Sequence, residues 1–237
     1  MATATNRTGP LRFRGLPDAV EAFVPLALGE ASFALEVDLP DPEAVAVLLA
    51  PSGPGTLVRL TLPTTTPAGM YEGTLTAGEE RYPAVVEVEP NRAVELYPAQ
   101  LRLRVAPGGR ATERLTLVNE GNVAVEVPRA DAVGLFPVDG ADRAIGGALR
   151  DDKAKGSARL DRLMDGLAGE HGGLLRIGVD QGAGPVEPGG VAEIALTLSA
   201  SDRLQPGRTY TAIWHLAGWT YAITVEAEPA PPKEQPR

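Results

Sequence analysis

Residues 196–210 read LTLSASDRLQPGRTY, and this stretch decides the fold. An alternating strand ends in it, a Pro-Gly corner follows, and a tyrosine opens the next strand. Residues 60–71, LTLPTTTPAGMY, repeat the same order. A last apolar segment follows each stretch, YPAVVEVEP at 82–90 and YAITVEAEP at 221–229. This self-similarity predicts a module that occurs twice.

Strands with a period of two dominate both halves of the chain. Residues 107–117 and 188–198 each begin with Pro-Gly-Gly and continue with apolar residues at every second position. That period is typical of a half-buried strand. Residues 119–122, Asn-Glu-Gly-Asn, lie between two such runs and predict a hairpin turn, because Asn and Gly tolerate positive φ. We therefore expect an all-β protein of two tandem immunoglobulin-like (Ig-like) antiparallel β-sandwiches, the second with a short helical insertion.

The predicted organisation has four parts. A flexible N-terminus (1–9) precedes the first sandwich (10–90), and the second sandwich (91–229) is followed by a flexible Pro-rich tail (230–237). In the first sandwich seven strands are expected, at 11–14, 22–28, 31–37, 44–49, 56–62, 71–76 and 84–89.

The second sandwich carries an insertion at about 138–173, in which the period of two is lost. Between Ser157 and Gly169 the apolar residues Leu160, Leu163, Met164 and Leu167 are spaced as one face of an amphipathic helix. Ser157 is a suitable N-cap, and the glycine ends the helix. Two interpretations of the stripe are open. It packs on its own sandwich, covering a sheet edge, or it docks a protein partner.

Composition excludes several classes of function. The 237 residues carry a net charge of −9, which is a poor surface for nucleic acid because binding needs Lys and Arg to neutralise phosphates. There is no Cys, so disulfides and thiolate metal sites are excluded. No apolar run is long enough to span a membrane, and the N-terminus lacks a secretory h-region. We expect a cytoplasmic protein, or one exported by a non-standard route, and the Arg, Ala, Gly and Pro bias suggests a GC-rich bacterial genome.

Residues for catalysis are sparse. The two histidines are predicted to lie in a loop (His171) and in a strand (His215), each without an adjacent nucleophile. We predict no enzyme activity and no cofactor. Weak candidates for a bound cation are the loop carboxylates Asp139, Asp142, Asp151 and Asp152, which lack the spacing of a calcium loop.

Aromatic residues gather on the last two strands. Trp214 and Trp219 lie there with Tyr210 and Tyr221, around a tight Ala-Gly turn. Two interpretations are open: a stacking platform for sugar or protein, or a Trp and a Tyr in the sandwich core.

The corner at 204–210 resembles the tyrosine corner of fibronectin type III and related Ig-like domains, and residues 67–71 look like a compressed version. This resemblance implies that the hydroxyl of Tyr210 bonds to backbone a few residues upstream. From about residue 93 to 228 the pattern of Pro-Gly-Gly turns and corner is similar to the bacterial Ig-like modules called NEW3-like. Two Ig-like domains in one chain also resemble the periplasmic pilus chaperones. These resemblances imply a fold and leave the function open.

Three hypotheses of function follow. The first is a non-enzymatic adaptor or structural component of a bacterial multiprotein assembly that binds other subunits, with the oligomeric state left open. The second is a carbohydrate-binding module that uses the Trp214 and Trp219 hairpin. The third is a strand-donating protein like the pilus chaperones.

Overall fold

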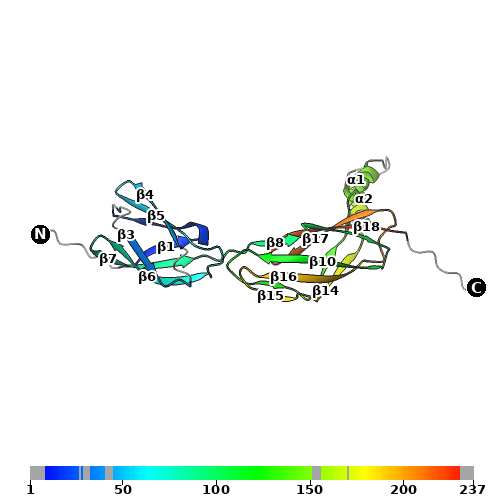
Figure 1. The fold of residues 1–237 in the computed structure, drawn as a ribbon. Coiled ribbons are helices and arrows are strands. Elements are labelled where there is room, and N and C mark those ends of the chain that lie inside the picture. Colours follow the sequence, from blue (N-terminus) through cyan, green and yellow to red (C-terminus); the bar gives the residue numbers. More distant parts are fainter. Residues whose placement is uncertain are drawn as a thin grey trace, which may run out of the picture. The chain divides into compact units, whose positions relative to one another are not determined.

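The computed structural model describes residues 9–26, 28, 33–40, 45–150, 156–169 and 171–229. The chain divides into two compact units (Figure 1). The first comprises Met1–Ala93 with Asn119–Val125 and Glu187–Gly190, and the second comprises Val94–Val118, Glu126–Val186 and Val191–Arg237. Residues 1–8 of the predicted N-terminal segment (1–9) and the whole predicted tail (230–237) lie outside the described residues.

The first unit is a curled seven-stranded sheet in the order β3-β6-β7-β1-β2-β5-β4. Its strands are β1 (Leu11–Gly15), β2 (Val20–Val24), β3 (Phe33–Val37), β4 (Ala46–Ser52), β5 (Gly55–Thr61), β6 (Gly69–Ala77) and β7 (Glu80–Val88), with a 3-10 turn, η1 (Pro17–Ala19), after β1. β1 pairs antiparallel with β2 and parallel with β7, so it joins the two halves of the sandwich. Each of the seven predicted strands corresponds to one of these.

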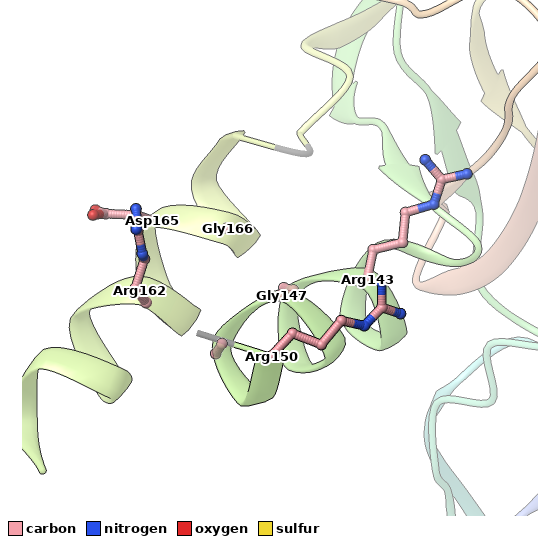
Figure 2. A pocket seen from close by; sticks show the side chains of 8 residues that line it. Arg143, Gly147, Arg150, Arg162, Asp165 and Gly166 are labelled. Atoms are coloured by element: carbon pink, nitrogen blue, oxygen red, sulfur yellow. The ribbon is translucent and has the colours of Figure 1, made fainter. Parts of the chain in front are cut away.

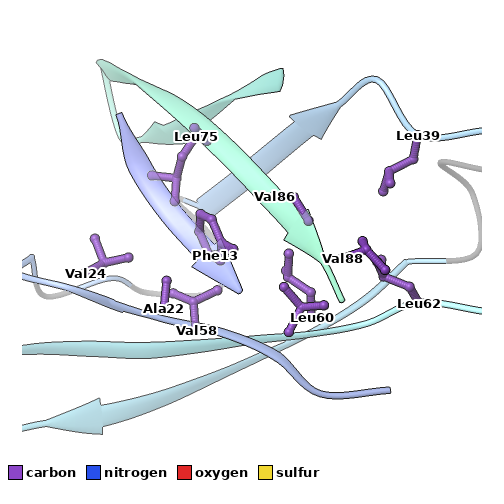
Figure 3. Packing of buried hydrophobic residues seen from close by; sticks show 12 residues of the cluster. Phe13, Ala22, Val24, Leu39, Val58, Leu60, Leu62, Leu75, Val86 and Val88 are labelled. Atoms are coloured by element: carbon purple, nitrogen blue, oxygen red, sulfur yellow. The ribbon is translucent and has the colours of Figure 1, made fainter. Parts of the chain in front are cut away.

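Alternating side chains of this sheet make the core of the first unit. Phe13 is fully buried and lies among Ala22, Val58 and Leu75, while Leu60 and neighbouring valines fill the rest (Figure 3). In β2 the burial pattern alternates strictly, as the period of two predicts. The apolar face is therefore enclosed between the two halves of the sheet.

The second unit is also a sandwich. One sheet has the order β12-β14-β16-β10-β8, a second has the order β13-β17-β18-β9, and β11 pairs with β15. The strands are β8 (Val94–Tyr97), β9 (Gln100–Val105), β10 (Arg110–Asn119), β11 (Val125–Val127), β12 (Ala130–Gly134), β13 (Phe136–Pro137), β14 (Leu174–Gln181), β15 (Gly184–Val186), β16 (Val191–Ser199), β17 (Thr209–Leu216) and β18 (Trp219–Ala227). The protein is thus all-β apart from two helices and a 3-10 turn among its described residues.

The Pro-Gly-Gly turns and the tyrosine corners predicted from the sequence are both present in the structure. In each Pro-Gly-Gly turn the middle glycine has φ of 71°, and the next glycine donates to the carbonyl before the proline at 2.8 Å. This is the geometry of a type II turn, which needs glycine at that position. The hydroxyl of Tyr210 accepts the Gln205 N–H at 2.9 Å, and the hydroxyl of Tyr71 donates to the Pro67 carbonyl at 2.7 Å. Both tyrosine corners are therefore formed.

The hairpin predicted at 119–122 is wrong. β10 pairs with β16 and β8, whereas β11 pairs with β15, so the strands on either side of this segment are not partners. The asparagines serve another purpose, because their side chains are buried and satisfy backbone groups. Asn122 accepts the Asn91 N–H at 2.6 Å and donates to the Glu89 carbonyl at 2.9 Å.

Candidate partner-binding surface

The insertion forms a hairpin of two helices, α1 (Gly140–Arg150) and α2 (Ser157–Gly169). The bounds of α2 confirm the predicted helix, whereas α1 was not predicted. Figure 1 shows the two helices side by side, standing away from the strands of the second unit. Asp139 precedes α1, and its carboxylate pairs with the Nε of Arg143 at 2.6 Å.

Small residues hold the two helices together. Gly140, Ala144 and Ala148 form the buried stripe of α1. A Cβ added at Gly166 of α2 would lie 3.2 Å from the Cβ of Ala144, so the helices cross at close range. Gly140 is needed for a related reason, since a Cβ there would lie 2.5 Å from the Pro137 ring. The hairpin is therefore closed by alanine and glycine, and its large apolar side chains are left for other contacts.

Those large side chains face solvent. They are Ile145 (46% exposed), Leu149 (59%), Leu160 (59%), Met164 (58%) and Leu167 (41%), and we call them the hairpin stripe. Of the predicted stripe, only Leu163 is half-buried. The interpretation in which this face packs on its own sandwich is wrong, because the described part of the chain leaves it uncovered.

A hollow of about 560 Å³ lies between the two helices, and none of its lining residues belongs to the stripe. Figure 2 shows its charged lining, with Arg143 and Arg150 from α1 and Arg162 and Asp165 from α2. Three arginines and one aspartate line this hollow, and one of the arginines, Arg143, is paired with Asp139.

The two tryptophans do not form a platform. Trp214 is fully buried, its Nε1 donates to Asp131 Oδ2 at 3.0 Å, and its ring meets Tyr221 edge-on. Of the two interpretations, the platform that uses Trp214 is therefore wrong and the core is confirmed, because Trp214 shares the inward face of β17 with Tyr210. Trp219 is half exposed, but it has no second tryptophan to stack beside.

Three tyrosine hydroxyls have raised pKa values. Burial, and then the nearby Glu113 carboxylate, raise the pKa of Tyr221 to about 12, and its hydroxyl donates to the Pro98 carbonyl at 2.6 Å. Burial also raises the pKa of Tyr71. A hydrogen bond to Glu80 raises the pKa of Tyr82. All three stay protonated at neutral pH and act as structural donors.

Neither histidine is placed for catalysis. His171 Nδ1 accepts the Gly173 N–H at 2.9 Å, and its ring meets Phe136 edge-on with centroids 4.9 Å apart. His215 lies in a strand, as predicted, and on the exposed face of β17. Each therefore has a structural or solvated environment.

The cation candidates are dispersed. Asp139 is paired with Arg143, and Asp142 lies in the first turn of α1. Asp151 and Asp152 lie outside the described residues. Within the described ranges no group of three or more His, Asp or Glu side chains is placed to hold a metal ion.

No helix among the described residues is long and apolar enough to cross a membrane.

Comparisons with known proteins bear on the fold. No protein-family model matches the chain, and no curated protein matches it. One similar solved structure is the ASH / PapD-like domain of human CEP192, with 13% identity over 58% of this chain and 87% of that chain, at a TM-score of 0.30. Domains 4 and 5 of the S-layer protein SbsC show 14% identity over 85% and 79%, at 0.29. Titin A168169 shows 10% identity over 94% and 97%, at 0.34.

These likenesses concern the fold alone and carry no argument for function. The fold class itself follows from the strand order and the two tyrosine corners. The resemblance of the second module to NEW3-like domains stays a prediction.

Helix α1 is the part of this surface that sequence reasoning missed. Its buried positions Gly140, Ala144 and Ala148 recur every four residues, and this spacing of small residues was the available signal. The exposed pair Ile145 and Leu149 is also spaced by four. A search for large apolar residues on a buried face could not find a helix that buries only small ones.

Proposed function

We propose that this protein is a non-enzymatic adaptor or structural component of a bacterial multiprotein assembly, and that it docks another protein on the hairpin stripe. The observation that carries the proposal is the exposure of five large apolar side chains on a helical hairpin in which α1 buries only small residues. A contiguous apolar patch on a projecting element is the usual mark of an interaction site.

The chemistry of the surface indicates the kind of partner. The stripe offers an apolar contact area. The expected partner segment is amphipathic and lays an apolar face on the stripe, in the manner of a helix laid along a groove.

The test is quantitative copurification from the native host with three forms of the chain. The wild type should retain an equimolar partner. The double variant Leu160→Glu/Met164→Glu should lose it, because two carboxylates would be desolvated within the apolar contact.

Val191→Glu is the matched control, since Val191 is an equally exposed apolar residue of the second unit outside the hairpin. It should bind like the wild type. Equal recovery of the partner by all three forms would refute the hairpin as the docking site, and a wild type that is always recovered alone would refute the adaptor function.

A further inference from the structure

The sheet of the first unit ends on an uncharged strand. Residues 45–51, Val-Ala-Val-Leu-Leu-Ala-Pro, contain no charged side chain, and β4 pairs with β5 alone among the described strands. A long, apolar, uncharged edge is a template for pairing with another strand. Natural proteins normally protect such edges with charge, proline or short length.

The other edges of the described sheets are protected in these ways. β3 carries Glu36, β8 carries Glu95, β12 carries Asp131, and β9 carries two arginines. β13 has only two residues, and the isolated pair of β11 and β15 has strands of three. β4 is longer than any of these edge strands, and it is the one whose central residues lack protection.

The register gives the backbone groups that point outward. Ser52 and Gly55 close a two-residue hairpin, so they form a hydrogen-bonded pair. Hydrogen-bonded and non-hydrogen-bonded pairs alternate along an antiparallel ladder. Val47 opposite Leu60 and Leu49 opposite Val58 are therefore non-hydrogen-bonded pairs. In a non-hydrogen-bonded pair the backbone N–H and C=O groups point away from the partner strand. Those of Val47 and Leu49 therefore point away from β5, toward the edge of the sheet.

The side chains at this edge are apolar as well. Leu48 is 61% exposed and Val47 is 41% exposed. On the outer face, Ala50 lies opposite Leu57, and Leu57 lies opposite Phe23, which is half exposed. The uncharged edge therefore continues into a row of apolar side chains across β5 and β2.

We propose that β4 pairs antiparallel with β4 of a second copy of this chain, forming a two-fold symmetric dimer. An antiparallel pair of identical strands has a two-fold axis. The same residues of β4 therefore supply the backbone donors and acceptors on both sides of the interface. Because residues 45–51 carry no charge, two acidic chains meet at this edge without like charges facing each other.

The register of the dimer follows from Pro51. A proline has no N–H, so a pairing that uses residue 51 loses hydrogen bonds. One register avoids this loss. Val47 lies opposite Val47 of the second copy, and Val45 of each copy lies opposite Leu49 of the other. All of these residues have an N–H that can donate. This register places the axis at Val47.

The dimer is expected to be weak and dependent on salt. A single strand pair buries less than the roughly 1,200–2,000 Å² of a standard interface, so a reversible equilibrium follows. Each chain carries a net charge of −9, and added salt screens the repulsion between the two. Dimerisation should therefore strengthen as salt is added.

Sedimentation velocity over a wide range of protein concentration tests the proposal on the full chain. The wild type should shift from monomer to dimer. Leu48→Lys should raise the dimer dissociation constant by about tenfold or more, because a charged side chain at the edge opposes pairing. Val47→Pro, which removes an outward N–H, should do the same without breaking the bonds between β4 and β5.

Val191→Lys is the matched control, since Val191 is equally exposed but lies on β16 of the second unit, outside β4 and the hairpin stripe. It should leave the dimer unchanged. A wild type that remains monomeric at every concentration, or a dimer that persists in both edge variants, would overturn the proposal. Failure of the hairpin stripe to bind a partner would leave these results unaffected, so the two proposals fail separately.

The chain has no native Cys, so a single introduced cysteine reports the register. Directly opposed residues of a hydrogen-bonded pair have Cα atoms about 5.5 Å apart, within the range that a disulfide spans. Val47→Cys should oxidise to a covalent dimer faster than Val191→Cys. Equal rates for the two variants would contradict the proposed register.

Discussion

Replacement of Tyr210 by Phe removes one hydroxyl from the corner of the second unit and keeps the ring. The hydroxyl accepts the backbone N–H of Gln205 at 2.9 Å, and the Tyr210 side chain is fully buried. The ring lies against Gly172, where an added Cβ would be 2.6 Å from it, and this packing is preserved by Phe. The substitution therefore isolates the hydrogen bond of the tyrosine corner.

The magnitude follows from the surroundings of the two partners. A typical intramolecular hydrogen bond contributes about 0.5–1.5 kcal/mol net, and an orphaned buried donor adds a cost of about 1–3 kcal/mol. Gln205 is an exposed residue, so water can reach part of its backbone and that cost is only partly incurred. We expect Tyr210→Phe to lower the free energy of unfolding by about 1.5 kcal/mol.

Urea unfolding followed by tryptophan fluorescence measures this loss. Both tryptophans lie in the second unit, and Trp214 is buried there, so the signal reports that unit. With m values of about 1–3 kcal/mol/M, the midpoint should fall by about 0.5–1.5 M with m unchanged. Tyr97→Phe is the matched control, because Tyr97 is an exposed tyrosine of the same unit and should change stability by less than about 0.5 kcal/mol. Equal losses for the two variants would refute the structural role of the corner.

Three further predictions concern single residues. Gly166→Val should separate the helices, because its Cβ would crowd Ala144 at 3.2 Å, and far-UV circular dichroism should show lost helix while tryptophan fluorescence is unchanged. The pKa of Tyr221 is raised to about 12, so its protonated form stabilises the fold below about pH 10 and that stabilisation is lost as pH rises toward 12. Urea midpoints at about pH 9 and 11 should therefore fall less in Tyr221→Phe than in the wild type. Asn122→Ala should lower the unfolding free energy by about 2–4 kcal/mol, measured by far-UV circular dichroism, because two backbone groups lose their partner; a loss below about 1 kcal/mol would contradict this.

The fold was predictable where local chemistry and tertiary structure agree. Alternating strands bury one face, and Pro-Gly-Gly fixes a turn that needs positive φ at its first glycine. Both tyrosine corners were marked by a tyrosine that follows a proline at a fixed short distance. These features depend on neighbours in sequence, and the structure confirms them.

Other features depend on partners far along the chain. Asn122 looked like a turn residue, but its contacts lie about thirty positions earlier, at Glu89 and Asn91. Trp214 was open to two interpretations, a binding platform or the core, although its alternation with Tyr210 already places both on the inward face of β17. The exposure of the hairpin stripe was not predictable, because it results from α1, whose buried face consists of small residues.

The docking role of the hairpin stripe is tested most directly by the oxidation of two methionines. Met164 lies in the stripe and is 58% exposed, and Met70 lies in the first unit and is 64% exposed, so one molecule carries both probe and reference. Oxidation by peroxide follows exposure, and mass spectrometry measures each rate. In the purified chain the two rates should be similar, and in the complex isolated from the native host Met164 alone should be protected. Protection of Met164 already in the purified chain, or equal rates in the complex, would contradict the account.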